Sequence, residues 1–136
     1  MTTFESTIRE IQYPQLSVYD MVSDLSHIER VRDRLPEDKM EGLTFTADYI
    51  AFKAPLGEVR LKIVEREAPK CVKFETEQSP VPFNFWIQVL PVTARSCKFK
   101  LTVKAELNPF IKGMVKQPLQ DALEKIADVL QMIRYE

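Results

Sequence analysis

The chain has 136 residues with 19 basic and 20 acidic side chains, a formal net charge of −1, and 45% hydrophobic residues. This length suits one domain with its own core, and the near-neutral charge excludes the concentrated Lys and Arg of a nucleic-acid binder. One His, two Cys and three Gly cannot build a conventional zinc site, a disulfide scaffold or a glycine-rich phosphate loop, so we expect no metal and no cofactor.

The amino-terminal residues predict a strand rather than a membrane segment. Residues 1–9 are polar and charged, and nothing in the chain approaches the ~18 consecutive apolar residues of a membrane span. We therefore expect a cytoplasmic protein without stable membrane insertion. Residues 3–11 alternate as a strand, with Phe4 and Ile8 on one face and Arg9 on the other.

Two short helices should follow this strand. Pro14 is suited to a first helical turn, and apolar residues then recur at helical spacing: Leu16, Val18, Tyr19, Met21, Val22 and Leu25. The sequence SHIE at residues 26–29 has the spacing of a capping box, in which Ser and Glu side chains satisfy free helical amides. It predicts a second helix that ends before Pro36.

From residue 40 to residue 107 the hydrophobic period is two. Shorter strands are expected at residues 43–46 and 49–54. The apolar side of the longer strands is formed by Val59, Leu61, Ile63, Val72, Phe74, Cys97, Phe99, Leu101, Val103, Ala105 and Leu107, with charged residues between them. Such one-sided strands predict an antiparallel sheet with one solvated face.

The segment from residue 83 to residue 90 is apolar on both faces, so its register stays open. We assign Phe83, Phe85, Ile87 and Val89 to the interior, which places Trp86 on the outer face. There it could anchor a partner or a second copy of the chain. The opposite register would turn Asn84, Trp86 and Gln88 inward as polar-tipped pocket residues.

A long helix should close the chain. Asn108 is a preferred N-cap, and Pro109 occupies the first helical position, where its missing amide is harmless. The expected apolar stripe is Ile111, Val115, Leu119, Ala122, Ile126, Val129 or Leu130, and Ile133. Pro118 lies inside this helix and is expected to bend it.

The order of elements predicts an α+β fold in which a curved antiparallel sheet of about seven strands surrounds the terminal helix. Two stretches carry this pattern of elements: YPQLSVYDMVSDLSHIERVRDRLP at residues 13–36 and LNPFIKGMVKQPLQDALEKIADVLQ at residues 107–131. In them the chain resembles the START-like superfamily, also called SRPBCC, which includes polyketide cyclases, plant pathogenesis-related allergens and lipid-transfer domains. The resemblance spans residues 1–136 as a single domain.

The resemblance implies a helix-grip fold with a deep apolar cavity between sheet and terminal helix, entered near the amino-terminal part of that helix. Such pockets usually measure about 300 to 1,000 Å³. The expected lining is Phe52, Leu61, Ile63, Phe74, Phe83, Phe85, Ile87, Phe99, Leu101, Val103, Met114, Val115, Leu119 and Ala122. The alternative is that these side chains fill a close-packed core and leave no cavity.

Two further residues carry open alternatives, and the two cysteines are assigned to opposite sides of the sheet. Gly113, early in the terminal helix, is either part of a flexible gate or a site of close helix packing. His27 is the first general-base candidate because its ordinary pKa lies near neutrality, yet no nucleophile accompanies it, so a packing role is the alternative. Cys97 falls on the apolar side of its strand and Cys71 on the exposed side.

We expect a noncatalytic domain that binds or carries a small hydrophobic molecule such as a lipid, isoprenoid or polyketide. The inward strand faces contain Thr76 as their one polar residue, whereas proton transfer needs charged or hydrogen-bonding groups in the pocket. One alternative is a cyclase, aromatase or dehydratase that uses His27, Asp20 or Asp48. The other is a protein-interaction module with a filled core, and a homodimer or protein partner stays open.

Overall fold

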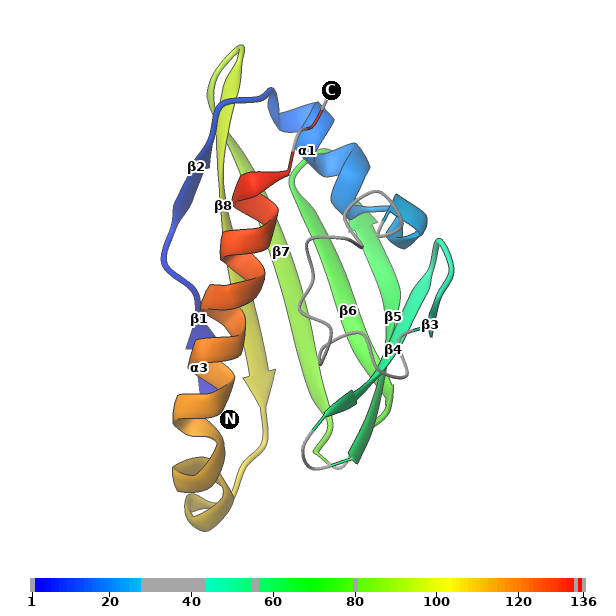
Figure 1. The fold of residues 1–136 in the computed structure, drawn as a ribbon, viewed down its shortest axis with the longest axis vertical. Helices are drawn as coiled ribbons and strands as arrows, with labels where there is room; N and C mark the ends of the chain where they lie inside the picture. The colour runs from blue at the N-terminus through cyan, green and yellow to red at the C-terminus, as the bar shows by residue number, and fades with distance from the viewer. Residues whose placement is uncertain (1, 28–43, 55–56, 80, 134, 136) are drawn as a thin grey trace.

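An eight-stranded antiparallel sheet and a long terminal helix form the computed structural model (Figure 1), which describes residues 2–27, 44–54, 57–79, 81–133 and 135. The expected α+β helix-grip architecture is confirmed. The strands are β1 Thr2–Glu5, β2 Arg9–Ile11, β3 Thr44–Phe45, β4 Tyr49–Ala54, β5 Gly57–Glu67, β6 Cys71–Gln78, β7 Phe83–Thr93 and β8 Ser96–Ala105, and the helices are α1 Gln15–Val22 and α3 Pro109–Met132. Their order is β1-β8-β7-β6-β5-β4-β3, and β2 also pairs with β8.

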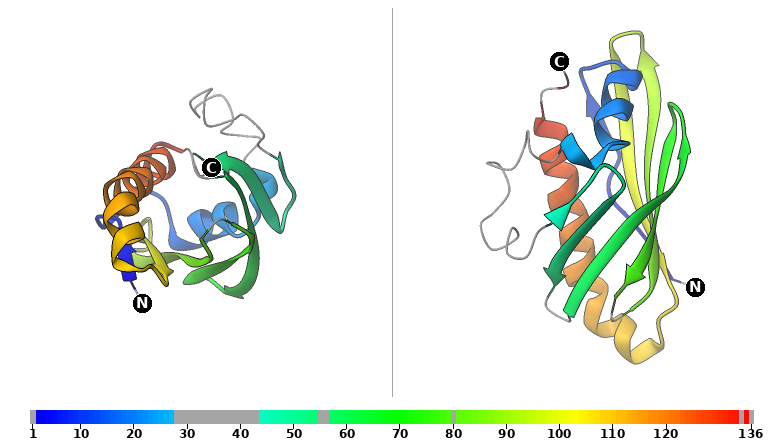
Figure 2. Two further views of the ribbon diagram at one scale, coloured as in Figure 1. Left: turned by 90° about the horizontal axis from the view of Figure 1, so that it is seen from below. Right: turned by 90° about the vertical axis from the view of Figure 1, so that its right-hand side faces the viewer.

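The two helices lie on the same face of the sheet, here called the inner face. Helix α3 packs on β1, β2 and β8, and α1 packs on β7 and β8. Figure 2 shows α3 running along the side of the sheet rather than across its middle. The apolar positions expected from the period of two are the buried ones: in β8, Cys97, Phe99, Leu101, Val103 and Ala105 are at most 4% exposed.

The register of β7 is the one that turns Phe85, Ile87 and Val89 inward, where all three are buried. Trp86 lies on the outer face and is half-buried. The ammonium groups of Lys73 and Lys104 each lie 5.5 Å from the centre of its ring, one from each neighbouring strand. These cation–π contacts cover the ring within the sheet itself.

The predicted single strand over residues 3–11 is wrong, because it is broken into β1 and β2. Phe4 pairs with Val103 and Arg9 with Phe99, so an advance of five residues from β1 to β2 matches an advance of four residues along β8. One extra residue reverses which face every later side chain points to. Ile8 is consequently 63% exposed, and Arg9, expected on the outer face, turns toward α3.

The break is stabilised by Ser6, which is buried. Its amide donates to the Leu101 carbonyl over 2.9 Å, and its hydroxyl accepts from the Leu101 amide over 3.0 Å. A side-chain oxygen thus replaces the backbone carbonyl that an unbroken strand would supply. Hydroxyl side chains compete with the backbone in this way, which the alternation of apolar residues does not reveal.

The segment after α1 is described only as far as His27. The Asp24 carboxylate accepts hydrogen bonds from the Ser26 amide over 3.0 Å and from the Ser26 hydroxyl over 2.6 Å. These bonds hold the pKa of Asp24 below its usual value. The rest of the predicted second helix, including Glu29 and the boundary at Pro36, lies outside the described residues.

Helix α3 begins as predicted. The side chain of Asn108 accepts a hydrogen bond from the Ile111 amide over 2.8 Å, and the helix runs through Pro118 to Met132. Its buried residues, however, are Leu123 and Ala127, whereas Ile126 of the expected stripe is 44% exposed. The packed face is therefore rotated by one position, since α3 contacts the β1–β8 side of the sheet rather than its centre.

Candidate functional site

The inner face of the sheet changes in burial from one end to the other. Along β7 the exposed fraction falls from 9% at Phe85 to 6% at Ile87 and 0% at Val89, and Phe83 before them is half-buried. Strand β6 runs the opposite way and agrees, with Val72 fully buried and Thr76 half-buried. The apolar interior is tightly packed at the α1 end and looser where α3 begins.

The amino-terminal half of α3 lies at this looser end and is itself poorly covered. Phe110 is 76% exposed and Met114 is 55% exposed, while Ile111, Val115 and Leu119 are half-buried. Leu123 is the first buried residue of the helix. An apolar stripe of three turns thus stands beside a half-buried part of the sheet, which is the combination that a small apolar ligand could complete.

The carboxyl-terminal half of α3, by contrast, is tied to the bulge between β1 and β2. The Arg9 guanidinium lies 2.8 Å from a Glu124 carboxylate oxygen and 2.6 Å from Asp128. Glu124 also accepts from the Thr7 amide over 2.6 Å. The hydrogen bonds to Asp128 and Glu124 raise the pKa of Arg9, and the bond from Arg9 lowers the pKa of Glu124.

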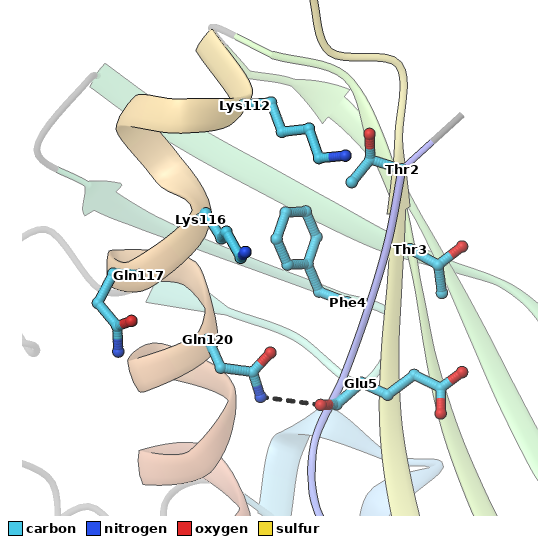
Figure 3. Close-up of a pocket in the computed structure, with 8 residues that line it drawn as sticks. All are labelled: Thr2, Thr3, Phe4, Glu5, Lys112, Lys116, Gln117 and Gln120. Carbon is cyan, nitrogen blue, oxygen red and sulfur yellow. Dashed lines mark hydrogen bonds between the residues drawn. The ribbon is translucent and has the colours of Figure 1, made fainter. Parts of the chain in front are cut away.

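One cavity of about 410 Å³ opens between β1 and the poorly covered half of α3 (Figure 3). Its wall is formed by Thr2, Thr3, Phe4, Glu5, Lys112, Lys116, Gln117 and Gln120. The Gln120 amide donates to the Glu5 carbonyl over 2.8 Å and closes one end. Phe4 is 6% exposed and belongs to the hydrophobic core, so the cavity wall and the inner face share this side chain.

The fourteen expected pocket residues divide by burial. Buried on the inner face are Leu61, Ile63, Phe74, Phe85, Ile87, Phe99, Leu101 and Val103; half-buried are Phe52, Phe83, Val115, Leu119 and Ala122; and Met114 is exposed. The cavity in Figure 3 has a different wall, although it adjoins theirs, since Phe4 pairs with Val103. Their role as ligand-lining residues stays a prediction.

Sequence reasoning missed Lys112 and Lys116. A usable signal was present, because they are four residues apart on one helix face and neither has an acidic residue three or four positions away. Glu5, on the facing strand, directs its carboxylate to Lys100 on the outer face, where the two groups lie 3.1 Å apart.

The described interior offers little for proton transfer. Apart from the phenols of Tyr19 and Tyr135 at the α1 end, the buried polar residues are Ser6, Ser96 and Thr102. The half-buried Thr76 uses its hydroxyl oxygen to accept from the Phe83 amide over 3.2 Å. Among the described side chains there is also no group of three His, Cys, Asp or Glu that could hold a metal ion.

The proposed catalytic candidates have other partners. The His27 ring is half-buried, and its Nδ1 lies 3.2 Å from the Met21 carbonyl oxygen. Asp48 is exposed and pairs with Arg66 at 2.8 Å, and Asp20 is exposed on α1.

No helix within the described ranges is long and apolar enough to cross a membrane.

The structure gives the surroundings of Gly113 and the burial of the two cysteines. A Cβ atom built on Gly113 would meet no described residue within 4 Å, so the close-packing explanation for this glycine is wrong among the residues that the structure describes. Cys97 is fully buried as expected, and burial raises the pKa of its thiol. Cys71, expected to be exposed, is half-buried, and burial together with Glu67 and Glu65 raises its pKa.

No protein-family model and no curated protein sequence matches the chain. Several solved structures, in contrast, are similar to the chain over nearly its whole length. Norcoclaurine synthase from Thalictrum flavum, in complex with dopamine and hydroxybenzaldehyde, is similar at a TM-score of 0.75 and 16% identity, over 96% of this chain and 84% of that one.

Two bacterial structures extend the comparison. A solution structure from Thermobifida fusca is similar at a TM-score of 0.72 and 20% identity, covering 99% and 93% of the two chains. A START superfamily protein from Mycobacterium smegmatis is similar at 0.68 and 12% identity, covering 95% and 94%. At these identities the likeness concerns the fold: the chain has the START-like, or SRPBCC, helix-grip fold.

Proposed function

We propose that the chain is a single-domain, noncatalytic protein of the cytoplasm that binds or carries a small hydrophobic molecule. The ligand would lie between the looser end of the inner face and the amino-terminal half of α3. The observation that carries this proposal is the exposure of the α3 stripe, with Met114 at 55% and Val115 half-buried, together with the half-buried Phe83, which pairs with Ala105 at the end of the sheet from which the chain enters α3. Covering apolar surface of this kind is favourable by about 25 cal/mol per Å².

The noncatalytic part of the proposal rests on the chemistry of the described interior. General acid–base catalysis needs a titratable group within hydrogen-bond reach of the substrate. Thr76 at the looser end does not titrate near neutral pH, and its oxygen already accepts a backbone hydrogen bond. The fold is compatible with catalysis, because norcoclaurine synthase shares it. A cyclase, aromatase or dehydratase activity therefore remains the alternative.

The first test is binding by the purified chain. Native mass spectrometry and organic extraction would detect a co-purified lipid, and the neutral fluorophore N-phenyl-1-naphthylamine would report an apolar site. We expect Val115→Asn to weaken uptake of the fluorophore at least tenfold, since it puts a polar amide against the ligand.

Leu90→Asn is the matched control. Leu90 is also a partly exposed apolar residue, at 45%, but it lies on the outer face of β7, so its replacement should leave uptake unchanged. No bound species together with no uptake by the wild-type chain would refute the proposal. Equal losses in the two variants would show that uptake reflects general surface stickiness.

A further inference from the structure

We propose that the cavity between β1 and α3 is a binding site for an anionic group, a carboxylate or phosphate, and that the ligand of this protein is amphipathic. The second clause rests on the proposed function, while the first stands on the cavity alone. The juxtaposition that carries the inference is Lys112 and Lys116 on the cavity wall, with the core residue Phe4 between them and the sheet.

The two lysines converge on the same hollow. They are one helical turn apart, so both side chains leave the same face of α3. Figure 3 shows the Lys112 ammonium directed toward Thr2 and the Lys116 ammonium beside the ring of Phe4. A volume of about 410 Å³ holds a small organic anion, since ligand pockets usually measure about 300–1,000 Å³.

The charge of this wall is not balanced within the described residues. Glu5, the acidic residue of the wall, is paired with Lys100 on the opposite side of β1. Asp121, the nearest acidic residue along the helix, accepts a hydrogen bond from Gln117 over 2.8 Å. Like charges four residues apart destabilise a helix, and an anion between them would reverse that effect.

The surroundings of the lysines specify more than a point charge. The hydroxyl of Thr2 can donate to an anion beside Lys112, and the Phe4 ring offers an apolar surface at the same depth. Phe4 pairs with the buried Val103, which in turn pairs with Phe85, two positions from the half-buried Phe83 at the looser end. An anionic head at the lysines would therefore leave its apolar tail next to the looser end of the interior.

The test compares two ligands of equal chain length that differ in charge. Octanoate and octanol compete with N-phenyl-1-naphthylamine for the wild-type chain, for the double variant Lys112→Gln/Lys116→Gln, and for the control Lys125→Gln. Lys125 is exposed on the far half of the same helix and lies outside the cavity wall. Thermal unfolding of each variant verifies that the fold is kept.

We expect the wild-type chain to bind octanoate about tenfold more tightly than octanol, which corresponds to two partly exposed charge-assisted contacts. The double variant should lose this preference with octanol binding unchanged, and Lys125→Gln should retain it. Added sodium chloride should weaken octanoate binding alone. Equal wild-type affinities would overturn the headgroup site, and a preference that survives in the double variant would overturn the role of the two lysines. Both results leave the proposed function intact.

A titration with inorganic phosphate separates a free anion from a ligand headgroup. Shifts of the Lys112 and Lys116 backbone amide signals in the NMR spectrum, absent from the double variant, would support a site for free anions even if no apolar ligand binds. Octanoate preference without such shifts would support a headgroup site. If phosphate causes no such shifts and the wild-type chain shows no preference for octanoate, the inference is overturned.

Discussion

Replacing Gly113 by alanine tests whether the first turns of α3 are as free of tertiary contact as the structure indicates. Gly113 is exposed, its backbone is helical, and an added Cβ would meet nothing within 4 Å in the part of the chain that the structure describes. Glycine inside a helix is less favourable than alanine by about 0.5–1 kcal/mol, because it loses more conformational freedom on folding. With no clash to offset that gain, Gly113→Ala should stabilise the chain by about 0.5–1 kcal/mol.

Urea and thermal unfolding followed by the fluorescence of Trp86, the single tryptophan, would measure this change. The expected rise in melting temperature is about 1–4 °C for a chain of this size. Gly57→Ala is the control, since Gly57 has a φ of 142°, which alanine adopts poorly, so it should be destabilising. A loss of stability in Gly113→Ala would refute the reasoning, because it would require a close neighbour at that turn.

Three more predictions concern residues outside the proposed sites. Arg9→Met should lower the free energy of unfolding by about 1–2 kcal/mol. This difference from wild type should shrink as the pH falls below about 4.5, because Arg9 lowers the pKa of Glu124 and stabilises the fold only while that carboxylate is charged. An unchanged difference at pH 3 in denaturant titrations would contradict this prediction. Asn108→Ala should lower stability by about 1 kcal/mol through loss of the Ile111 cap, measured by urea unfolding with Asn108→Ser as the conservative control. Tyr19→Phe should be neutral or stabilising, since the buried Tyr19 hydroxyl has no hydrogen-bond partner among the described residues, and a loss above about 1 kcal/mol would show that it has one.

The sheet was predictable because period-two alternation reports burial directly. In β8 every second residue from Cys97 to Ala105 is buried, and the lysines between them face outward, as the alternation indicated. The N-cap at Asn108 was equally readable, because the side chain and the following proline act locally. Local chemistry of this kind needs no knowledge of what lies across the fold.

The predictions for the first strand and for the packed face of α3 were wrong because tertiary contacts override the local pattern of apolar residues there. Ser6 breaks the first strand by bonding to Leu101, which is 95 residues away along the chain. The resulting shift brings Arg9 within 2.8 Å of Glu124 on α3. A stripe read from apolar spacing alone could not include this contact, so Ile126 was placed inward in error.

The candidate site was predictable only in outline. The looser end of the interior lies beside the amino-terminal part of the last helix, where the resemblance located the entrance. The cavity wall, in contrast, was missed because polar residues such as Lys112 and Gln120 are usual on a solvated helix face. Their importance depends on the opposite wall, which β1 supplies from the other end of the chain.

The most direct test of the account is to locate a bound neutral apolar ligand by NMR. In the complex with N-phenyl-1-naphthylamine, intermolecular nuclear Overhauser effects are predicted to the methyl groups of Val115 and Leu119 at the looser end. The fully buried Val72 and Val89 at the tight end should give none. Failure of the ligand to bind, or contacts confined to the tight end or to the outer face, would contradict the claim that this fold holds a hydrophobic molecule beneath the start of α3.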